Sequence, residues 1–196
     1  RTGAHDLRSD YYDDVLIKAL PDLTNEKNAL IVIHLMGCHG SYADRYPEDW
    51  KHYSGKSDVI DKYDNAVRYN DYVLQQIYEK LKENPRFKGF IYFSDHGEDV
   101  EHNYGHEASK YTATMSHIPL FMAFSPDFQA ERAQTVETLR SHENSYWTND
   151  LLYDVMTDIL GIQGVPGTDL NWNLALSQYS MTKDTLRTLH GKQALQ

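Results

Sequence analysis

Two side chains with metal-binding chemistry, Asp95 and His96, directly follow a run rich in strand-forming residues at 90–94. Both side chains prefer water to a protein interior unless a partner satisfies them, so the pair is poorly suited to packing a core. A divalent metal is the simplest partner, because carboxylate oxygen and imidazole nitrogen are ordinary zinc ligands. Gly97 allows a sharp backbone turn beside the ion, and Glu98 adds a second carboxylate. The pattern predicts a metal site where this strand ends.

A second stretch, residues 31–40, repeats the arrangement of an apolar run followed by histidine and glycine, with His34 and His39 as its histidines. A single histidine is more often a satisfied core or surface residue than a ligand. Two clusters of the same type at strand ends favour a metal site over a purely structural reading, because open α/β sheets carry their sites at the carboxyl ends of strands. Three more histidines follow the first cluster: His102, His106 and His117.

The elements that must position these residues are two strands and a long helix. Residues 29–35 are almost entirely apolar without alternation, which predicts a strand buried on both faces in a parallel or mixed sheet. Residues 58–83 carry apolar side chains at three- and four-residue steps, with Ser57 as a cap and a stop at 84–85, and this pattern predicts an amphipathic helix. A strand, a helix and a second strand at 90–94 form a βαβ crossover, so we expect an α/β fold.

Further elements are predicted less fully. They are a short helix between Ser9 and Pro21, loops over the site at 40–57 and 99–117, a strand at 120–124 and an amphipathic helix at 147–160. Gly161 is expected at the C-terminal cap of that last helix. Residues 127–144 are polar, with at most a turn of helix, and the final 35 residues give no clear pattern.

Composition limits the functions that fit the chain. Its 196 residues, 40% of them apolar and 15 of them tyrosine, are sufficient for one globular domain. A formal charge of −10 argues against a nucleic-acid partner, although a bound metal can still attract an anionic substrate. The single cysteine, Cys38, allows no intrachain disulfide, and no apolar run of about 20 residues predicts a membrane span. Because the chain opens on Arg1 without a signal peptide, we expect it to be part of a longer protein.

Four stretches of the chain share their motifs with a known family, over roughly residues 10–162. They are residues 34–40 with 45–47 behind them, 63–74, 93–98 with His106 and 117–120 after them, and 148–154. Together they resemble the C-terminal half of the catalytic domain of bacterial phosphoethanolamine transferases, in the alkaline phosphatase and sulfatase superfamily. The Asp-His-Gly-Glu element is typical of the superfamily, and His-x-x-Gly-x-His-Gly followed by Arg-Tyr-Pro is more specific.

The resemblance implies a fold and a set of site residues. The fold would be a three-layer α/β/α alkaline-phosphatase-like sheet, with residues 1–196 as the partial periplasmic catalytic domain, lacking the N-terminal membrane spans and the part that bears the nucleophile. The implied roles are zinc ligation by Asp95 and His96, phosphoryl contact or a second zinc for His39 and His106, and substrate contact for His34, Glu98 and His117. For His117, plain packing is the alternative.

Departures from the family pattern limit what the chain can do alone. The family's threonine nucleophile and its acidic zinc ligand lie upstream of the matched motifs, and nothing here corresponds to them. We therefore predict no catalytic nucleophile in this chain, weak metal binding and no turnover by the chain alone. Cys38 stands where the pattern has a small serine, as a packing substitute or a spare ligand. His102 competes with His106 as a ligand, and the Tyr-Gly-His pattern favours His106.

The function implied is zinc-dependent transfer of phosphoethanolamine from a phospholipid, phosphatidylethanolamine, to lipopolysaccharide, at lipid A or a core sugar. A phospho-threonine intermediate is expected, in a parent protein of the bacterial inner membrane whose catalytic domain faces the periplasm. The alternatives are a sulfatase, a phosphoglycerol transferase or phosphohydrolase, and a catalytically inactive metal-binding domain. The Asp-His-Gly element fits all of the enzymes, while the two-histidine motif fits the alternatives less well.

Overall fold

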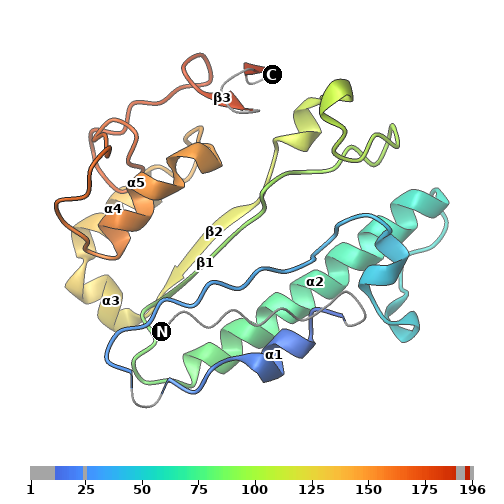
Figure 1. Ribbon diagram of the computed structural model, residues 1–196, viewed down its shortest axis with the longest axis horizontal. Coiled ribbons are helices and arrows are strands. Elements are labelled where there is room, and N and C mark those ends of the chain that lie inside the picture. Colours follow the sequence, from blue (N-terminus) through green and yellow to red (C-terminus); the bar gives the residue numbers. More distant parts are fainter. Residues whose placement is uncertain (1–11, 24–25, 189–192, 195–196) are drawn as a thin grey trace. The chain divides into compact units, whose positions relative to one another are not determined.

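The computed structural model describes residues 12–23, 26–188 and 193–194, which fall into two compact units (Figure 1). Unit 1 comprises the residues up to Phe87 together with Val100–Gly105. Unit 2 comprises Lys88–Asp99 and the residues from His106 onward. The candidate cap Ser9 of the predicted first helix lies outside the described residues.

Unit 1 is built on one long helix, α2 (Asp58–Lys82), which confirms the predicted helix to within one residue. The hydroxyl of Ser57 accepts a hydrogen bond from the backbone N–H of Ile60 at 3.4 Å, as predicted for an N-cap. The apolar stripe of the helix is buried: Ala66, Tyr69, Val73, Leu74 and Ile77. The short helix α1 (Val15–Ala19) packs against α2, and Lys80 Nζ donates to the carbonyl of Ile17 at 2.7 Å.

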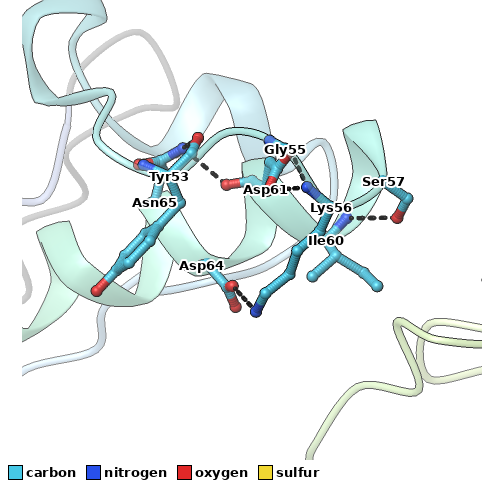
Figure 2. A network of polar contacts seen from close by, with 8 residues as sticks. All are labelled: Tyr53, Gly55, Lys56, Ser57, Ile60, Asp61, Asp64 and Asn65. Atoms are coloured by element: carbon cyan, nitrogen blue, oxygen red, sulfur yellow. Dashed lines mark hydrogen bonds and ion pairs between the residues drawn. The ribbon is translucent and has the colours of Figure 1, made fainter.

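The segment before α2 contains the 3₁₀ helices η1 (Tyr42–Arg45) and η2 (Glu48–Trp50), followed by a loop whose backbone is held by α2 (Figure 2). Asn65 is 2% exposed, and its Oδ1 accepts from the N–H groups of His52 and Tyr53 at 2.7 and 2.9 Å. Its Nδ2 donates to the Tyr53 carbonyl at 3.0 Å. One turn earlier, the Asp61 carboxylate accepts from the N–H groups of Gly55 and Lys56. Side chains four residues apart on one helix face thus fix the loop.

Replacing Asn65 by alanine is expected to lower the free energy of unfolding by roughly 2–3 kcal/mol, because several hydrogen bonds of about 1 kcal/mol each are lost. Urea unfolding measures the change, and limited proteolysis is expected to cut first within residues 52–57. The matched control is Asn144→Ala, since Asn144 is exposed. Equal stability of the two variants would show that the loop does not depend on Asn65.

The predicted strand at 29–35 is wrong as a sheet element. These residues are extended but belong to none of the sheets formed by the described residues, and Val32 is 83% exposed. An extended run forms a ladder only where another strand lies alongside to pair its N–H and C=O groups. The predicted βαβ crossover is therefore not formed by the described residues.

Unit 2 contains an antiparallel pair, β1 (Gly89–Phe93) and β2 (Leu120–Phe124) (Figure 1). Its register runs from Gly89 opposite Phe124 to Phe93 opposite Leu120. Both strands were predicted. Alternate residues point to one face of such a pair, and that face packs on the core of the unit: Ile91, Leu120, Met122 and Phe124. A second small antiparallel pair joins β3 (Arg187–Thr188) and β4 (Gln193–Ala194).

Helices supply the rest of the core of unit 2. They are α3 (Pro126–Glu131), α4 (Ala133–Ser141) and α5 (Leu152–Ile159), preceded by η5 (Asn149–Leu151). The buried residues between them are Phe128, Val136, Val155, Ile159, Leu174 and Ala175. The polar stretch at 127–144, expected to hold at most a turn of helix, forms two helices because Ser125 caps α3 and tertiary packing stabilises both. Gly161 follows α5 at φ 67°, as predicted for its cap.

Among the helices of the described residues, none has both the length and the apolar character that crossing a membrane requires.

Candidate metal centre

Three potential ligands gather beyond the end of β1 in unit 2: His96, Glu98 and His106. Each offers one ligand atom, and these atoms all lie within 4.8 Å of one another. His106 Nδ1 lies 2.7 Å from Glu98 Oε1, and the rings of His96 and His106 have their centroids 4.2 Å apart. The Glu98 side chain is 6% exposed. Two imidazoles and one carboxylate are a known ligand set of catalytic zinc, which keeps a fourth position open, so these residues fit a zinc ion.

The end of β1 presents His96 through a tightly bonded turn. Ser94 Oγ donates to the carbonyl of His96 at 2.7 Å, and the N–H of Gly97 donates to the carbonyl of Met115 at 2.8 Å. His96 Nδ1 lies 3.0 Å from the carbonyl of Gly97. A carbonyl can only accept, so Nδ1 carries the proton and Nε2 keeps its lone pair for a ligand bond.

Asp95 lies beside this cluster and not within it. Its Oδ2 is 3.9 Å from His96 Nε2, on the side of the nitrogen that is available for ligation, and its side chain is 82% exposed. The carboxylate of Glu98, expected in the substrate pocket, lies within the ligand cluster. The roles of Asp95 and Glu98 as a ligand and as a substrate contact stay predictions.

The structure distinguishes His102 from His106, the two histidines that follow Glu98. His106 joins the cluster, whereas the ring of His102 stacks on Tyr104 in unit 1, with centroids 5.5 Å apart. The spacing of four residues that would align both histidines requires a helix, and residues 101–106 contain no helical residue. The geometry therefore favours His106, as the Tyr-Gly-His pattern did.

The other predicted histidines near glycine lie in unit 1, and their relation to the cluster stays a prediction. The turn between His34 and His39 closes with a hydrogen bond from the N–H of His39 to the carbonyl of Met36 at 3.0 Å. Gly37 stands in this turn at φ 54°, a conformation that suits glycine. The carboxylate of Asp13 accepts from the N–H groups of Met36 and Gly37 at 3.1 and 2.8 Å, which fixes the turn.

A cleft of about 1510 Å³ in unit 2 extends from the cluster along β2 and the loop before α5. Asp95, His96 and His106 line it, and so does the exposed residue His117, which was predicted to contact substrate. Much of the remaining wall is apolar, from Ile118 through the strand β2. A concave site with a few convergent polar groups is typical of ligand binding.

The charge next to the cluster is fixed by a local ion pair. The Lys110 ammonium donates a hydrogen bond to Glu107 and, together with the hydroxyl of Ser109, lowers the pKa of that carboxyl. Glu107, the residue that follows His106, therefore stays ionised and is paired with Lys110 and Ser109.

Sequence reasoning missed two residues that fix backbone segments beside predicted site residues, Asp13 in unit 1 and Asn149 in unit 2. Asn149 Nδ2 donates to the carbonyl of Ser94 at 2.8 Å, 55 residues away in the chain. Neither residue carries a signal in its own sequence neighbourhood, because each binds backbone atoms that only the fold brings near. Asn149 did lie within a stretch that resembled the transferase family.

The chain matches the family model described as Sulfatase over residues 2–157. The chain belongs to the sulfatase family. This confirms the predicted superfamily and its α/β class, of which the helices of both units and the small antiparallel sheets of unit 2 are a part. The chain is also similar in sequence to curated proteins named phosphoethanolamine transferases.

It is 29% identical to phosphoethanolamine transferase EptA of Salmonella typhimurium over 173 residues, which cover 78% of this chain and 32% of the relative. It is 28% identical to phosphoethanolamine transferase EptC of Escherichia coli over 205 residues, which cover 94% of this chain and 34% of the relative. EptA of Helicobacter pylori is 35% identical over 104 residues, 45% of this chain and 20% of the relative. The chain thus spans about a third of the length of EptA of Salmonella typhimurium and of EptC of Escherichia coli. No solved structure matches it significantly.

Proposed function

We propose that this sulfatase-family chain supplies metal-binding residues of a phosphoethanolamine transferase. The observation that carries the proposal is the cluster of His96, Glu98 and His106, set at the end of β1 in a chain whose relatives bear that name. Sulfatase-family enzymes generally use metal ions, and these three residues would hold one. The metal we propose is zinc, which suits two imidazoles and a carboxylate.

The chain's own residues would prepare the site for phosphoryl transfer. When bound, the metal would neutralise charge on the phosphate oxygens and activate a nucleophile. Glu98 is buried and bonded to His106, so it orients that imidazole, and the Gly97 carbonyl orients His96 through its Nδ1 proton. The cleft along β2 would admit the substrate beside the ligands.

The finer part of the proposal concerns a longer protein that contains this chain. A threonine hydroxyl outside the chain would attack the phosphorus of phosphatidylethanolamine, release diacylglycerol and carry the phosphoethanolamine, which a lipopolysaccharide oxygen would then accept as the threonine is regenerated. The protein would be held in the bacterial inner membrane by spans outside this chain, with the catalytic domain in the periplasm. The resemblance of the motifs and the names of the relatives support this part.

The experiment is headgroup transfer by the protein encoded by the complete reading frame. With labelled phosphatidylethanolamine as the donor and lipopolysaccharide as the acceptor, we expect mass spectrometry to detect an acceptor heavier by one phosphoethanolamine group. Glu98→Gln is expected to lower the rate at least tenfold, because it removes the charge bonded to His106. The matched control is Glu101→Gln, since Glu101 is exposed. Release of sulfate from an aryl sulfate ester without any headgroup transfer would contradict the proposal.

A further inference from the structure

Asn149 connects the loop before α5 to the end of β1. The β1–β2 ladder stops at the pair Phe93 and Leu120, so Ser94 is the first residue beyond it. The carbonyl of Ser94 accepts a hydrogen bond from Asn149 Nδ2 at 2.8 Å. A side chain therefore satisfies the first backbone carbonyl beyond the β1–β2 ladder, where the chain leaves the sheet and turns toward His96.

The orientation of the Asn149 amide is unambiguous, and it leaves one atom without a partner. The Ser94 carbonyl can only accept, so the amide nitrogen must face it and the amide oxygen must point elsewhere. That oxygen, Oδ1, is buried and makes no hydrogen bond within the part of the chain that the structure describes. A buried amide oxygen without a partner costs folding free energy. Asn149 thus holds the end of β1 through its Nδ2, while its buried Oδ1 lowers the stability of the fold.

A short series of hydrogen bonds leads from Asn149 to the His96 ring. Asn149 fixes Ser94, the Ser94 hydroxyl donates to the His96 carbonyl at 2.7 Å, and His96 Nδ1 lies 3.0 Å from the Gly97 carbonyl. Each contact restrains the next part of the turn. The position of His96 Nε2, the nitrogen available to a metal, therefore depends on a residue that offers no ligand atom itself.

We propose that Asn149 is a positioning residue for the metal site: its Nδ2 holds the Ser94 carbonyl and thereby sets the His96 imidazole for zinc. The proposal rests on the proposed ligand cluster of His96, Glu98 and His106. Groups that support ligands from outside the coordination sphere typically change metal affinity by 10–100-fold when they are removed. We expect an effect at the lower end of that range, because Asn149 acts through the backbone and not on the imidazole directly.

The test is zinc binding by the 196-residue chain and its variants, measured by competition with a chromogenic chelator, together with thermal unfolding of the metal-free proteins. Asn149→Leu keeps the size of the side chain and removes both the donor and the unpartnered oxygen. We expect its zinc dissociation constant to rise about tenfold while its metal-free unfolding temperature changes little. A merely structural role would lower the unfolding temperature without this selective loss of zinc. Asn144→Leu, an exposed position in the same loop, is the matched control.

A second variant keeps the test decisive if Asn149→Leu folds poorly. Ser94→Ala removes the next hydrogen bond in the series, and we expect a threefold to tenfold rise in the zinc dissociation constant. Because both groups act on one turn, the double variant is expected to be less impaired than the two separate effects combined. Zinc binding that is unchanged in Asn149→Leu and in Ser94→Ala would overturn the inference alone. Zinc binding that persists without His96 and His106 would overturn the proposed cluster, and the inference with it.

Discussion

Replacing His96 or His106 by alanine is expected to reduce the zinc affinity of the 196-residue chain by more than about a hundredfold. Each imidazole is one of only three ligand atoms that the cluster offers, and its loss leaves two. Loss of a supporting group outside the ligands typically costs roughly 10–100-fold, so loss of a ligand must exceed that range. In either variant the remaining pair includes the Glu98 carboxylate, whose side chain is 6% exposed.

Zinc bound after purification, measured by plasma mass spectrometry, and affinity from chelator competition together check this expectation. His52→Ala is the matched control, because His52 is exposed and its ring contacts Tyr53 rather than the cluster. Asp95→Asn is informative as well, since its carboxylate lies 3.9 Å from His96 Nε2. A loss as large as that of His96→Ala would establish Asp95 as a ligand, as the sequence predicts. Full zinc content in both histidine variants would contradict the cluster.

The parts of the fold that could be predicted are those whose signal is local. Helix α2 has a cap at Ser57 and a stripe of apolar residues at helical spacing, and its predicted bounds are nearly those observed. The strand β1 and the glycine after α5 carry similarly local signals. The run at 29–35 has the composition of a strand, but a strand exists only with a neighbour to pair with. Composition cannot supply that neighbour, and this prediction failed.

The candidate site was predicted in its residue types and not in all of its partners. A strand end with Asp-His-Gly-Glu predicted a metal site there, and the family resemblance implied His96 as a zinc ligand and His106 as a phosphoryl contact or second-zinc ligand. The structure brings both histidines together with Glu98. Glu98 is expected in the substrate pocket, and spacing along the chain does not reveal that its carboxylate lies 2.7 Å from His106 Nδ1. Asn149 could not be found, since its role depends on a contact across 55 residues. The chemistry that a side chain can perform follows from its residue type, whereas the residues that hold that side chain in place are set by tertiary contacts.

Replacing Gly97 by alanine is expected to lower the free energy of unfolding of the chain by at least roughly 3 kcal/mol, at the upper end of the range for overpacking. An added Cβ at this position would lie 2.2 Å from the carbonyl oxygen of Thr114, which is backbone and cannot rotate away. The hydrogen bond from the Gly97 N–H to the Met115 carbonyl holds the two segments at this close approach. Glycine is therefore required here for space between segments, because its φ lies outside the left-handed region.

The clash would act on the metal site as well as on stability. Moving the turn away from Thr114 would shift His96, which precedes Gly97 and bonds to its carbonyl, so zinc affinity is expected to fall together with the unfolding free energy. Urea unfolding and chelator competition measure the two effects. Gly40→Ala is the matched control, because a Cβ there would meet nothing within 4 Å. If Gly97→Ala were as stable as Gly40→Ala and bound zinc as tightly as the unaltered chain, the close approach at Thr114 would not be what holds His96 in place.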